Sequence, residues 1–282
     1  MTYDKSAIKN QQSLYNFMAI PEDCRLNNRV FKKLFHQNAK LGTTDKKAFR
    51  EDIDTITWQY TLKPSTIPIL PYEDDQREYH EVAVLHVDLK TRKRTARIAE
   101  IMHRAIPYPL LIVFAHEKVC ALSTAHKRFS QAEKGAVVAE DFMITDWIDL
   151  SNPTSVQKDF MASLVIAAFP HTHFFAFYSA LVDRLVAVDC AGLTGVYRLE
   201  SAAAKRLARR DRLAACHDLK GRIEELRTAI KKETQFNRQV GLNTKMKEVE
   251  KQLKRKLPDF RQEDKADGKA GPENRRRDAG HR

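Results

Sequence analysis

The sequence of 282 residues predicts an α+β fold: a small mixed β-sheet with flanking helices, then a helical section and a C-terminal coiled-coil-like long helix or helical hairpin. Three observations support this prediction. Residues 81–90 and 110–114 are apolar and rich in β-branched side chains, which is typical of buried strands. Residues 92–105, between them, carry apolar side chains at helical spacing. After residue 201, apolar residues recur at alternating steps of four and three, as in a coiled-coil seam.

The first fifty residues are expected to be helical. After Pro21, which suits a first helical turn, an apolar stripe at helical spacing is formed by Leu26, Val30, Phe31, Leu34 and Phe35. Thr43-Thr44-Asp45 is suited to cap a third short helix that runs to Ile53. Residues 56–62 then alternate apolar and polar side chains, which predicts a half-buried strand.

The middle of the chain completes the predicted sheet. Residues 119–122 are expected to return as the hairpin partner of residues 110–114, and a further strand is expected over 142–148. The order strand, helix, hairpin, strand predicts one mixed sheet with helices packed on one face. Because Ser151-Asn152-Pro153 signals a boundary, we predict an α/β N-terminal domain over residues 1–150.

The remainder divides into three predicted sections. Residues 151–200 form an apolar helical section, with two strongly apolar helices around Pro170. Residues 201–258 form a basic long-helical coiled-coil-like arm, which Pro258 is expected to end. Residues 259–282 are polar and are predicted to be a disordered tail.

The seam of the predicted arm is interrupted. Its apolar positions form two runs, which are Leu219, Ile223, Leu226 and Ile230, then Leu242, Met246, Val249 and Leu253. Residues 231–243 replace the seam with amides and charges, and the second run restarts two residues out of phase. The helix is therefore expected to change face here, and Gly241 would let it bend. Two predictions stay open for this stretch: the tip of a helical hairpin, or a polar docking patch of Gln235, Asn237, Arg238 and Asn243.

The positive charge of the protein is concentrated near the C-terminus. The net charge is +12, and residues 201–282 hold 24 lysines and arginines against 13 acidic residues, which leaves residues 1–200 almost neutral. A polyanionic partner such as DNA is therefore expected to meet the C-terminal segment, although a solvated surface helix has the same composition. The residues predicted to bind nucleic acid or a partner protein are Lys231, Lys232, Gln235, Asn237, Arg238, Asn243, Lys245 and Lys247.

Several kinds of chemistry are not expected. The four cysteines have no metal-binding spacing and predict reduced thiols in a cytoplasmic protein, and no apolar run is long enough to indicate a membrane partner. His171 and His173 follow Pro170 without a supporting ligand motif, so no metal site is predicted. No glycine-rich phosphate loop or Rossmann fingerprint is found, and no cofactor is expected.

One pattern allows an enzymatic alternative. Asp88-Leu-Lys90 ends a strand, and an acid-x-lysine sequence with an upstream acid is how many restriction-type nucleases hold Mg²⁺ and position the attacking water. Asp52 is one candidate for the upstream acid, and Asp54, Asp74 and Asp75 are the others. Such short patterns are common by chance, so the nuclease with Mg²⁺ stays an alternative.

Taken in order, a set of short motifs resembles the bacterial domain-of-unknown-function family 4391. The motifs are Glu51-Asp52-Ile53, Ile56-Thr57-Trp58, Leu62 to Thr66, Leu89-Lys90, Ile106 to Pro109, Trp147, Arg184, Leu193-Thr194-Gly195, Gln235 to Val240 and Leu242-Asn243. Gly241 departs from the family, which more often has an acidic residue at that position. The resemblance implies an accessory component encoded beside helicases and DNA methyltransferases in restriction-like, phage-defence loci, with no assigned reaction.

Charge and resemblance together predict a non-catalytic accessory or adaptor subunit of such a defence system. Its expected partners are the helicase or DNA methyltransferase subunits of the same operon, and DNA. Two alternatives stay open: the Mg²⁺-dependent nuclease centred on Asp88 and Lys90, and a structural protein that forms homo-oligomers through the C-terminal arm without nucleic acid.

Overall fold

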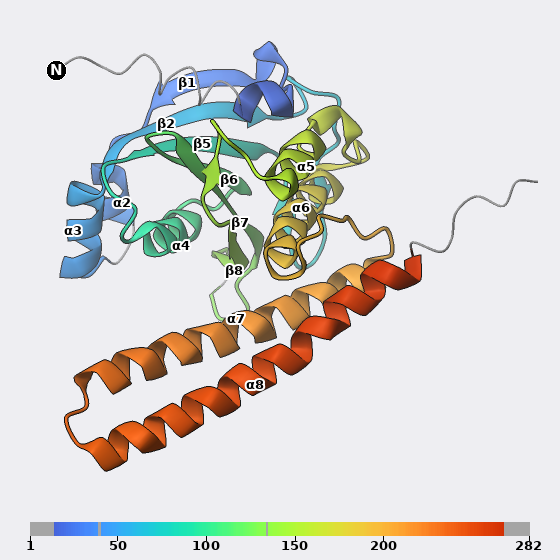
Figure 1. Cartoon of the computed structure of the whole chain (residues 1–282). Helices are drawn as coiled ribbons and strands as arrows, with labels where there is room; N and C mark the ends of the chain where they lie inside the picture. Colours follow the sequence, from blue (N-terminus) through green and yellow to red (C-terminus); the bar gives the residue numbers. More distant parts are fainter. Residues whose placement is uncertain (1–13, 39–40, 134, 268–282) are drawn as a thin grey trace, which may run out of the picture. The chain divides into compact units, whose positions relative to one another are not determined.

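The computed structural model describes residues 14–38, 41–133 and 135–267, which form an α+β fold with a mixed sheet and C-terminal helices (Figure 1). The chain divides into two compact units, residues 1–192 and residues 193–282. The finer four-part division expected from the sequence stays a prediction. Among the helices described, none combines the length and the apolar character needed to cross a membrane.

The first unit is built on a seven-stranded sheet. Its strands follow the spatial order β1-β2-β5-β6-β7-β8, and β9 pairs with β7. The pair β5 and β6 is parallel, and the other neighbouring strands of this sheet are antiparallel. The bounds are β1 Arg25–Arg29, β2 Ile53–Leu62, β5 Val82–Leu89, β6 Leu110–His116, β7 Val119–Phe129, β8 Val137–Ile144 and β9 Ile148–Asp149, with a separate hairpin of β3 Tyr72–Glu73 and β4 Glu78–Tyr79.

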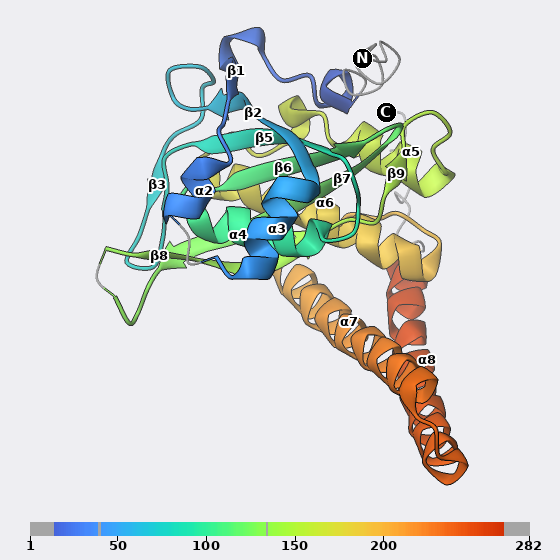
Figure 2. The same ribbon diagram turned by 90° about the vertical axis from the view of Figure 1, so that its left-hand side faces the viewer.

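Helices cover both faces of this sheet (Figure 2). On one face, Leu85 and Val87 of β5 pack in a core with Ile98 and Met102 of α4 (Thr95–Ala105), and α2 (Lys33–Asn38) and α3 (Thr43–Glu51) join this core. On the other face, His126 of β7 packs against α6 (Phe174–Thr194) through the ring of Tyr178. The prediction of helices on one face was therefore wrong, because the almost wholly apolar α6 also needs a surface to cover.

The N-terminal region also differs from the prediction. Residues 14–18 are helical, but residues 25–29 form strand β1 and not a helix. A short 3₁₀ turn, η1 (Glu22–Cys24), follows Pro21, and Asn27 has a φ of 51°, which a right-handed helix does not allow. All five residues of β1 are exposed, so the strand lacks the alternating pattern by which strands are found.

The later elements of the first unit lie close to their predicted places. The strand expected over 142–148 is split between β8 and β9, and Trp147 lies between the two. The apolar helical section contains α5 (Ser155–Ser163), a 3₁₀ turn η2 (Ile166–Ala168) and α6. Thr154 caps α5 through its side chain, which accepts a hydrogen bond from the Gln157 backbone.

The second unit contains a helical hairpin of α7 (Ala203–Lys232) and α8 (Phe236–Asp267), which lie side by side (Figure 1). The eight predicted seam residues are buried or half-buried, and Arg227 of α7 lies 3.5 Å from Glu250 of α8.

Two details of the predicted arm were wrong. The turn lies at residues 233–235, while Gly241 is inside α8, and α8 passes Pro258 and ends at Asp267. Residues 259–267 are thus helical, and residues 268–282 of the predicted tail lie outside the described residues.

Candidate nucleic-acid interface

The turn of the hairpin is held by hydrogen bonds of its own polar residues. The Glu233 carboxylate accepts the backbone N–H groups of Thr234 and Gln235, both at 2.9 Å, and these bonds lower the pKa of Glu233. Gln239 donates its side-chain N–H to the Glu233 carbonyl at 2.6 Å. The amide-rich stretch therefore forms the tip of a hairpin, which was one of its two predicted roles.

The predicted binding residues fall into two groups along the hairpin. Five lie close in sequence around the turn, and all five are exposed: Lys231, Lys232, Gln235, Asn237 and Arg238. Lys245 and Lys247 are exposed on later turns of α8, about 10 Å further along its axis. Asn243 is half-buried and donates its side-chain N–H to the Gln239 carbonyl at 3.0 Å, so this amide is used within α8.

Lys247, one of the predicted binding residues, belongs to a basic stripe on α8, and only the face that carries this stripe was not predicted. Lys247, Lys251 and Lys254 follow one another at steps of four and three residues, which places them along one face of the helix. At 100° per residue, this face points away from the seam residue Val249. The three ammonium groups are exposed, and no described residue forms an ion pair with them. The sequence shows the spacing of these lysines, but it does not show that the partner helix α7 covers the opposite side of α8.

Other basic residues of the hairpin are used within it. Arg209 is buried, donates to the Arg198 carbonyl at 2.7 Å and lies 3.9 Å from the Glu200 carboxylate. Arg206 donates to the Ser201 carbonyl at 2.6 Å. These two arginines are therefore used internally, whereas exposed basic residues stand at the turn, on α8 and, with Lys220 and Arg222, on α7.

The turn also exposes apolar side chains that the sequence did not single out. Phe236, the first residue of α8, is 75% exposed, and Val240, one turn later, is 48% exposed. Neither side chain is covered by the seam between the two helices. An aromatic residue inside a polar stretch and out of phase with the seam was the available signal.

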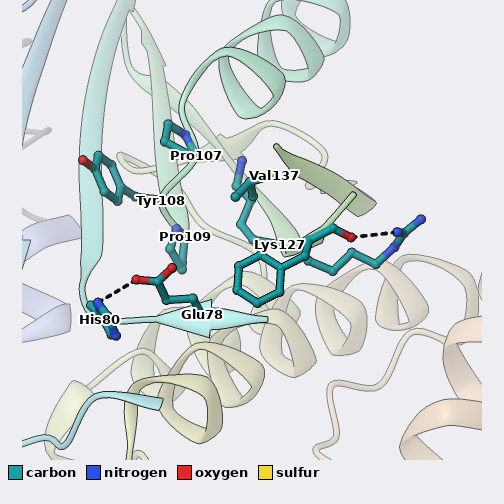
Figure 3. A pocket seen from close by; sticks show the side chains of 9 residues that line it. Glu78, His80, Pro107, Tyr108, Pro109, Lys127 and Val137 are labelled. Carbon is teal, nitrogen blue, oxygen red and sulfur yellow. Dashed lines mark hydrogen bonds and ion pairs between the residues drawn. The ribbon is translucent and has the colours of Figure 1, made fainter. Parts of the chain in front are cut away.

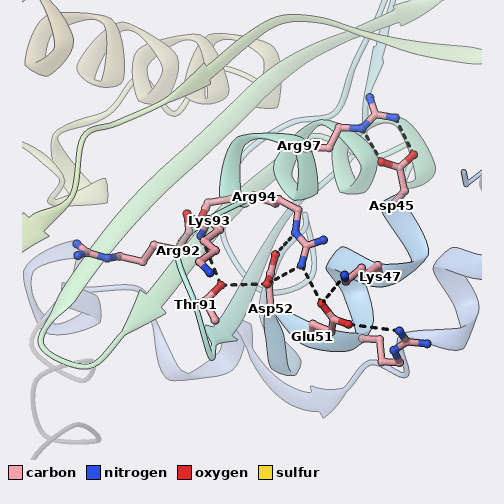
Figure 4. Close-up of polar contacts among 11 residues, drawn as sticks. Asp45, Lys47, Glu51, Asp52, Thr91, Arg92, Lys93, Arg94 and Arg97 are labelled. Carbon is pink, nitrogen blue, oxygen red and sulfur yellow. Dashed lines mark hydrogen bonds and ion pairs between the residues drawn. The ribbon is translucent and has the colours of Figure 1, made fainter. Parts of the chain in front are cut away.

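Asp52, named as a possible catalytic acid, is held in a buried ion pair (Figure 4). Its carboxylate accepts two hydrogen bonds from Arg94, at 2.5 and 2.9 Å, and one from the Thr91 hydroxyl at 3.0 Å. These bonds lower the pKa of Asp52. The Asp52 carbonyl also accepts the Lys90 N–H, so this residue joins the end of α3 to the loop after β5.

Asp88 and Lys90 lie in a different set of contacts. Asp88 accepts a hydrogen bond from the Thr55 hydroxyl and lies 3.3 Å from Nε2 of the buried His86, whose Nδ1 is bonded to the Tyr15 hydroxyl. The Lys90 ammonium lies 3.9 Å from Asp54, and both side chains are half-exposed. Asp74 is used in a surface turn, where it accepts the N–H groups of Gln76 and Arg77.

These contacts bear on the metal that the nuclease alternative requires. Lys90 forms its ion pair with Asp54, while the Asp52 carboxylate is hydrogen-bonded to Arg94. In the described part of the chain, no three His, Cys, Asp or Glu residues are grouped so that they could hold a metal ion. The donor set around Asp88 therefore fits Mg²⁺ poorly, because this cation needs several oxygen ligands in near-octahedral geometry.

A second feature that the sequence did not reveal is the buried Lys127 on β7. Its ammonium donates hydrogen bonds to the carbonyls of His103 and Ile106, the latter at 2.7 Å, and thereby caps the C-terminal end of α4. Lys127 also lines a cavity of about 200 Å³ beside Tyr108, Glu78 and His80 (Figure 3). Burial lowers the pKa of Lys127 to about 7.

The lowered pKa of Lys127 predicts a pH-dependent stability. Between about pH 7 and the ordinary lysine pKa of 10.5, Lys127 binds a proton in the unfolded chain but not in the folded chain. The free energy of unfolding therefore rises with pH in this range. The unfolding free energy of the wild type, relative to Lys127→Met, should rise by about 1 kcal/mol per pH unit between pH 7.5 and 9.5. Urea denaturation of both proteins at each pH measures this; a constant difference would show that Lys127 stays charged when buried.

The fold and the exposed charges define an α+β protein with a basic helical hairpin. The chain belongs to the family described as Domain of unknown function (DUF4391), whose model matches residues 18–253, as the ordered motifs predicted. Neither a curated protein nor a solved structure matches the chain.

Proposed function

We propose that the protein is a non-catalytic accessory subunit of a cytoplasmic, helicase- and methyltransferase-associated phage-defence system, and that it binds DNA through the α7–α8 hairpin. The observation that carries the DNA part is the stripe of Lys247, Lys251 and Lys254, which are exposed and without ion-pair partners among the described residues. The defence context rests on the family resemblance. Helicase or methyltransferase subunits of the same operon are the protein partners.

The geometry of the stripe suits a polyphosphate backbone. Lys247 and Lys254 are seven residues apart, about 10 Å along the helix axis. Duplex DNA carries one phosphate charge per about 1.7 Å of its axis, so each of the three ammonium groups can meet a phosphate within this length. Lysine contacts phosphate as a mobile point charge, and it carries no base preference in that role. The binding is therefore expected to be independent of sequence.

Self-association through the arm is the alternative without nucleic acid. The seam residues of α7 and α8 cover one another within a single chain, so a second copy is not needed to bury them. Light scattering during size-exclusion chromatography, with and without duplex DNA, separates the two. The proposal predicts a complex only with DNA, and a dimer of unchanged mass in both runs would favour self-association.

The DNA-binding proposal is tested by fluorescence anisotropy of a 30-base-pair duplex with the full-length protein. The dissociation constant should rise steeply with salt, because bound lysines release counterions from the phosphates. If the protein contacts five or six phosphates, the logarithm of the binding constant plotted against the logarithm of the salt concentration should have a slope of about −5. Absence of binding at 50 mM salt would contradict the proposal.

A restriction-type nuclease is the second candidate, and one observation favours it. The Lys90 ammonium lies 3.9 Å from the Asp54 carboxylate, and Lys90 follows Asp88 by two residues in the sequence. The carboxylates of Asp54 and Asp88 thus come from the adjacent strands β2 and β5, and Lys90 directly follows β5. If the chain is such a nuclease, Asp88→Ala and Lys90→Ala should each lower Mg²⁺-dependent DNA cleavage at least a hundredfold, as loss of catalytic groups does. Asp159→Ala, at an exposed residue of α5, is the matched control. A wild type that cleaves no DNA, alone or with its operon partners, ends this candidate.

A further inference from the structure

The feature that the proposed function leaves unused is Phe236 at the turn of the hairpin. At 75%, it is the most exposed of the large apolar side chains described. The seam between α7 and α8, where an aromatic residue could be buried, does not cover it. The hydrogen bonds of Glu233 and Gln239 hold the turn, and the Phe236 side chain takes no part in them.

The surroundings of Phe236 are basic. Lys231 and Lys232 end α7, and Arg238 lies in the first turn of α8, and all three are exposed. The acidic residue of the turn, Glu233, is turned inward on the backbone N–H groups of residues 234 and 235. The turn therefore carries one exposed aromatic ring together with three exposed cations, and this combination is complementary to a nucleobase with its phosphates.

Resting on the proposed DNA binding, we infer that the hairpin turn recognises unpaired bases, and that Phe236 stacks on a base at a single strand or a duplex fork. Paired bases inside a duplex show no free face to an aromatic ring. Unpaired bases do, and stacking on aromatic side chains is how single-strand-binding proteins hold them without reading sequence. The lysine stripe of α8 would contact the adjoining phosphates. The substrate class is thus DNA with a junction between paired and unpaired strands.

The inference is tested with the full-length protein and three DNA probes that share one sequence: a 30-base-pair duplex, a 30-nucleotide single strand and a fork. The wild type should bind the fork about tenfold more tightly than the duplex. Phe236→Ala should lose this preference and keep its duplex affinity. Phe236→Trp should keep the preference, because tryptophan also stacks. Leu207→Ala is the matched control, since Leu207 is an exposed apolar residue of α7.

A spectroscopic readout keeps stacking apart from charge. With 2-aminopurine as the first unpaired base of the fork, the wild type should change its fluorescence on binding, and Phe236→Ala should not. An unchanged fork preference in Phe236→Ala would overturn the inference while the proposed function stands. Failure of the wild type to bind any of the three probes at 50 mM salt would overturn both. Circular dichroism of each variant verifies that the hairpin is folded.

Discussion

Replacing Asp52 with alanine should lower the free energy of unfolding by about 3 kcal/mol, because the substitution breaks a buried ion pair. Asp52 is 2% exposed, and its partner Arg94 is 25% exposed. Removing the carboxylate leaves the partly buried Arg94 guanidinium with only Glu51, at 3.4 Å, as an ionic partner, and it frees the Thr91 hydroxyl. The contact joins α3 to the loop before α4, 42 residues away in the sequence, so its loss also loosens long-range packing.

Asp45 provides a matched control for Asp52. It forms a similar two-bond pair with Arg97, and each arginine has a second carboxylate partner, Glu100 for Arg97 and Glu51 for Arg94; however, Arg97 is 47% exposed and Arg94 only 25%. Asp45→Ala should therefore cost only about 1 kcal/mol. Urea unfolding followed by circular dichroism measures both variants. If Asp52→Ala is no more destabilised than Asp45→Ala, the assignment of Asp52 as the main polar link of the first unit is wrong.

The Asp52 pair also predicts a dependence on acid. The pKa of Asp52 is lowered in the folded protein, below the ordinary value of 3.8. The stabilisation that the ionised carboxylate provides is therefore present at neutral pH and is lost as the pH falls through this lowered pKa. In Asp52→Ala this component is absent. The gap in unfolding free energy between the wild type and the variant should accordingly narrow below about pH 4.

The largest expected effect on function comes from the lysine stripe. Changing Lys247, Lys251 and Lys254 together to glutamine should weaken duplex binding on the order of tenfold to a hundredfold at 100 mM salt. The magnitude of the log–log salt slope should fall by about 2.7, since each phosphate contact contributes about 0.9. All three side chains lie on the exposed face of α8 and away from the seam, so the fold should be unaffected.

A second triple variant separates local contact from total charge. Lys46, Lys118 and Lys158 are exposed lysines of the first unit, and their replacement by glutamine removes the same charge. This control should keep nearly the wild-type salt slope. Equal loss of binding in the two triple variants would mean that net charge alone attracts DNA and that the hairpin has no special role.

The sequence was most informative where burial imposes a pattern. Strands β5 and β6 and helix α4 were predicted because their apolar residues face a common core, and the seam of the hairpin was readable for the same reason. Strand β1 was missed because its five residues are all exposed at the edge of the sheet. The hairpin turn was placed near Gly241, but hydrogen bonds of Glu233 and Gln239 decide its position, and these depend on the folded geometry.

The candidate sites depended more on contacts that one sequence does not reveal. Asp52 and Arg94 are 42 residues apart, so the pairing that gives Asp52 a structural role could not be predicted. Lys127 of β7 caps the end of α4, 21 residues earlier in the sequence, and periodicity does not show such a contact. The basic character of the arm was predicted from composition, but the face that carries Lys251 and Lys254 could be chosen only after the partner helix was known.

The most direct test of the central claim is lysine footprinting of the full-length protein with and without fork DNA. Brief acetylation followed by mass spectrometry reports the accessibility of each lysine. Exposed lysines of the hairpin, namely Lys231, Lys232, Lys247, Lys251 and Lys254, should be protected severalfold by DNA, while Lys46, Lys118 and Lys158 should not. Protection confined to the first unit, or none at all under conditions of full binding, would contradict a DNA-binding hairpin.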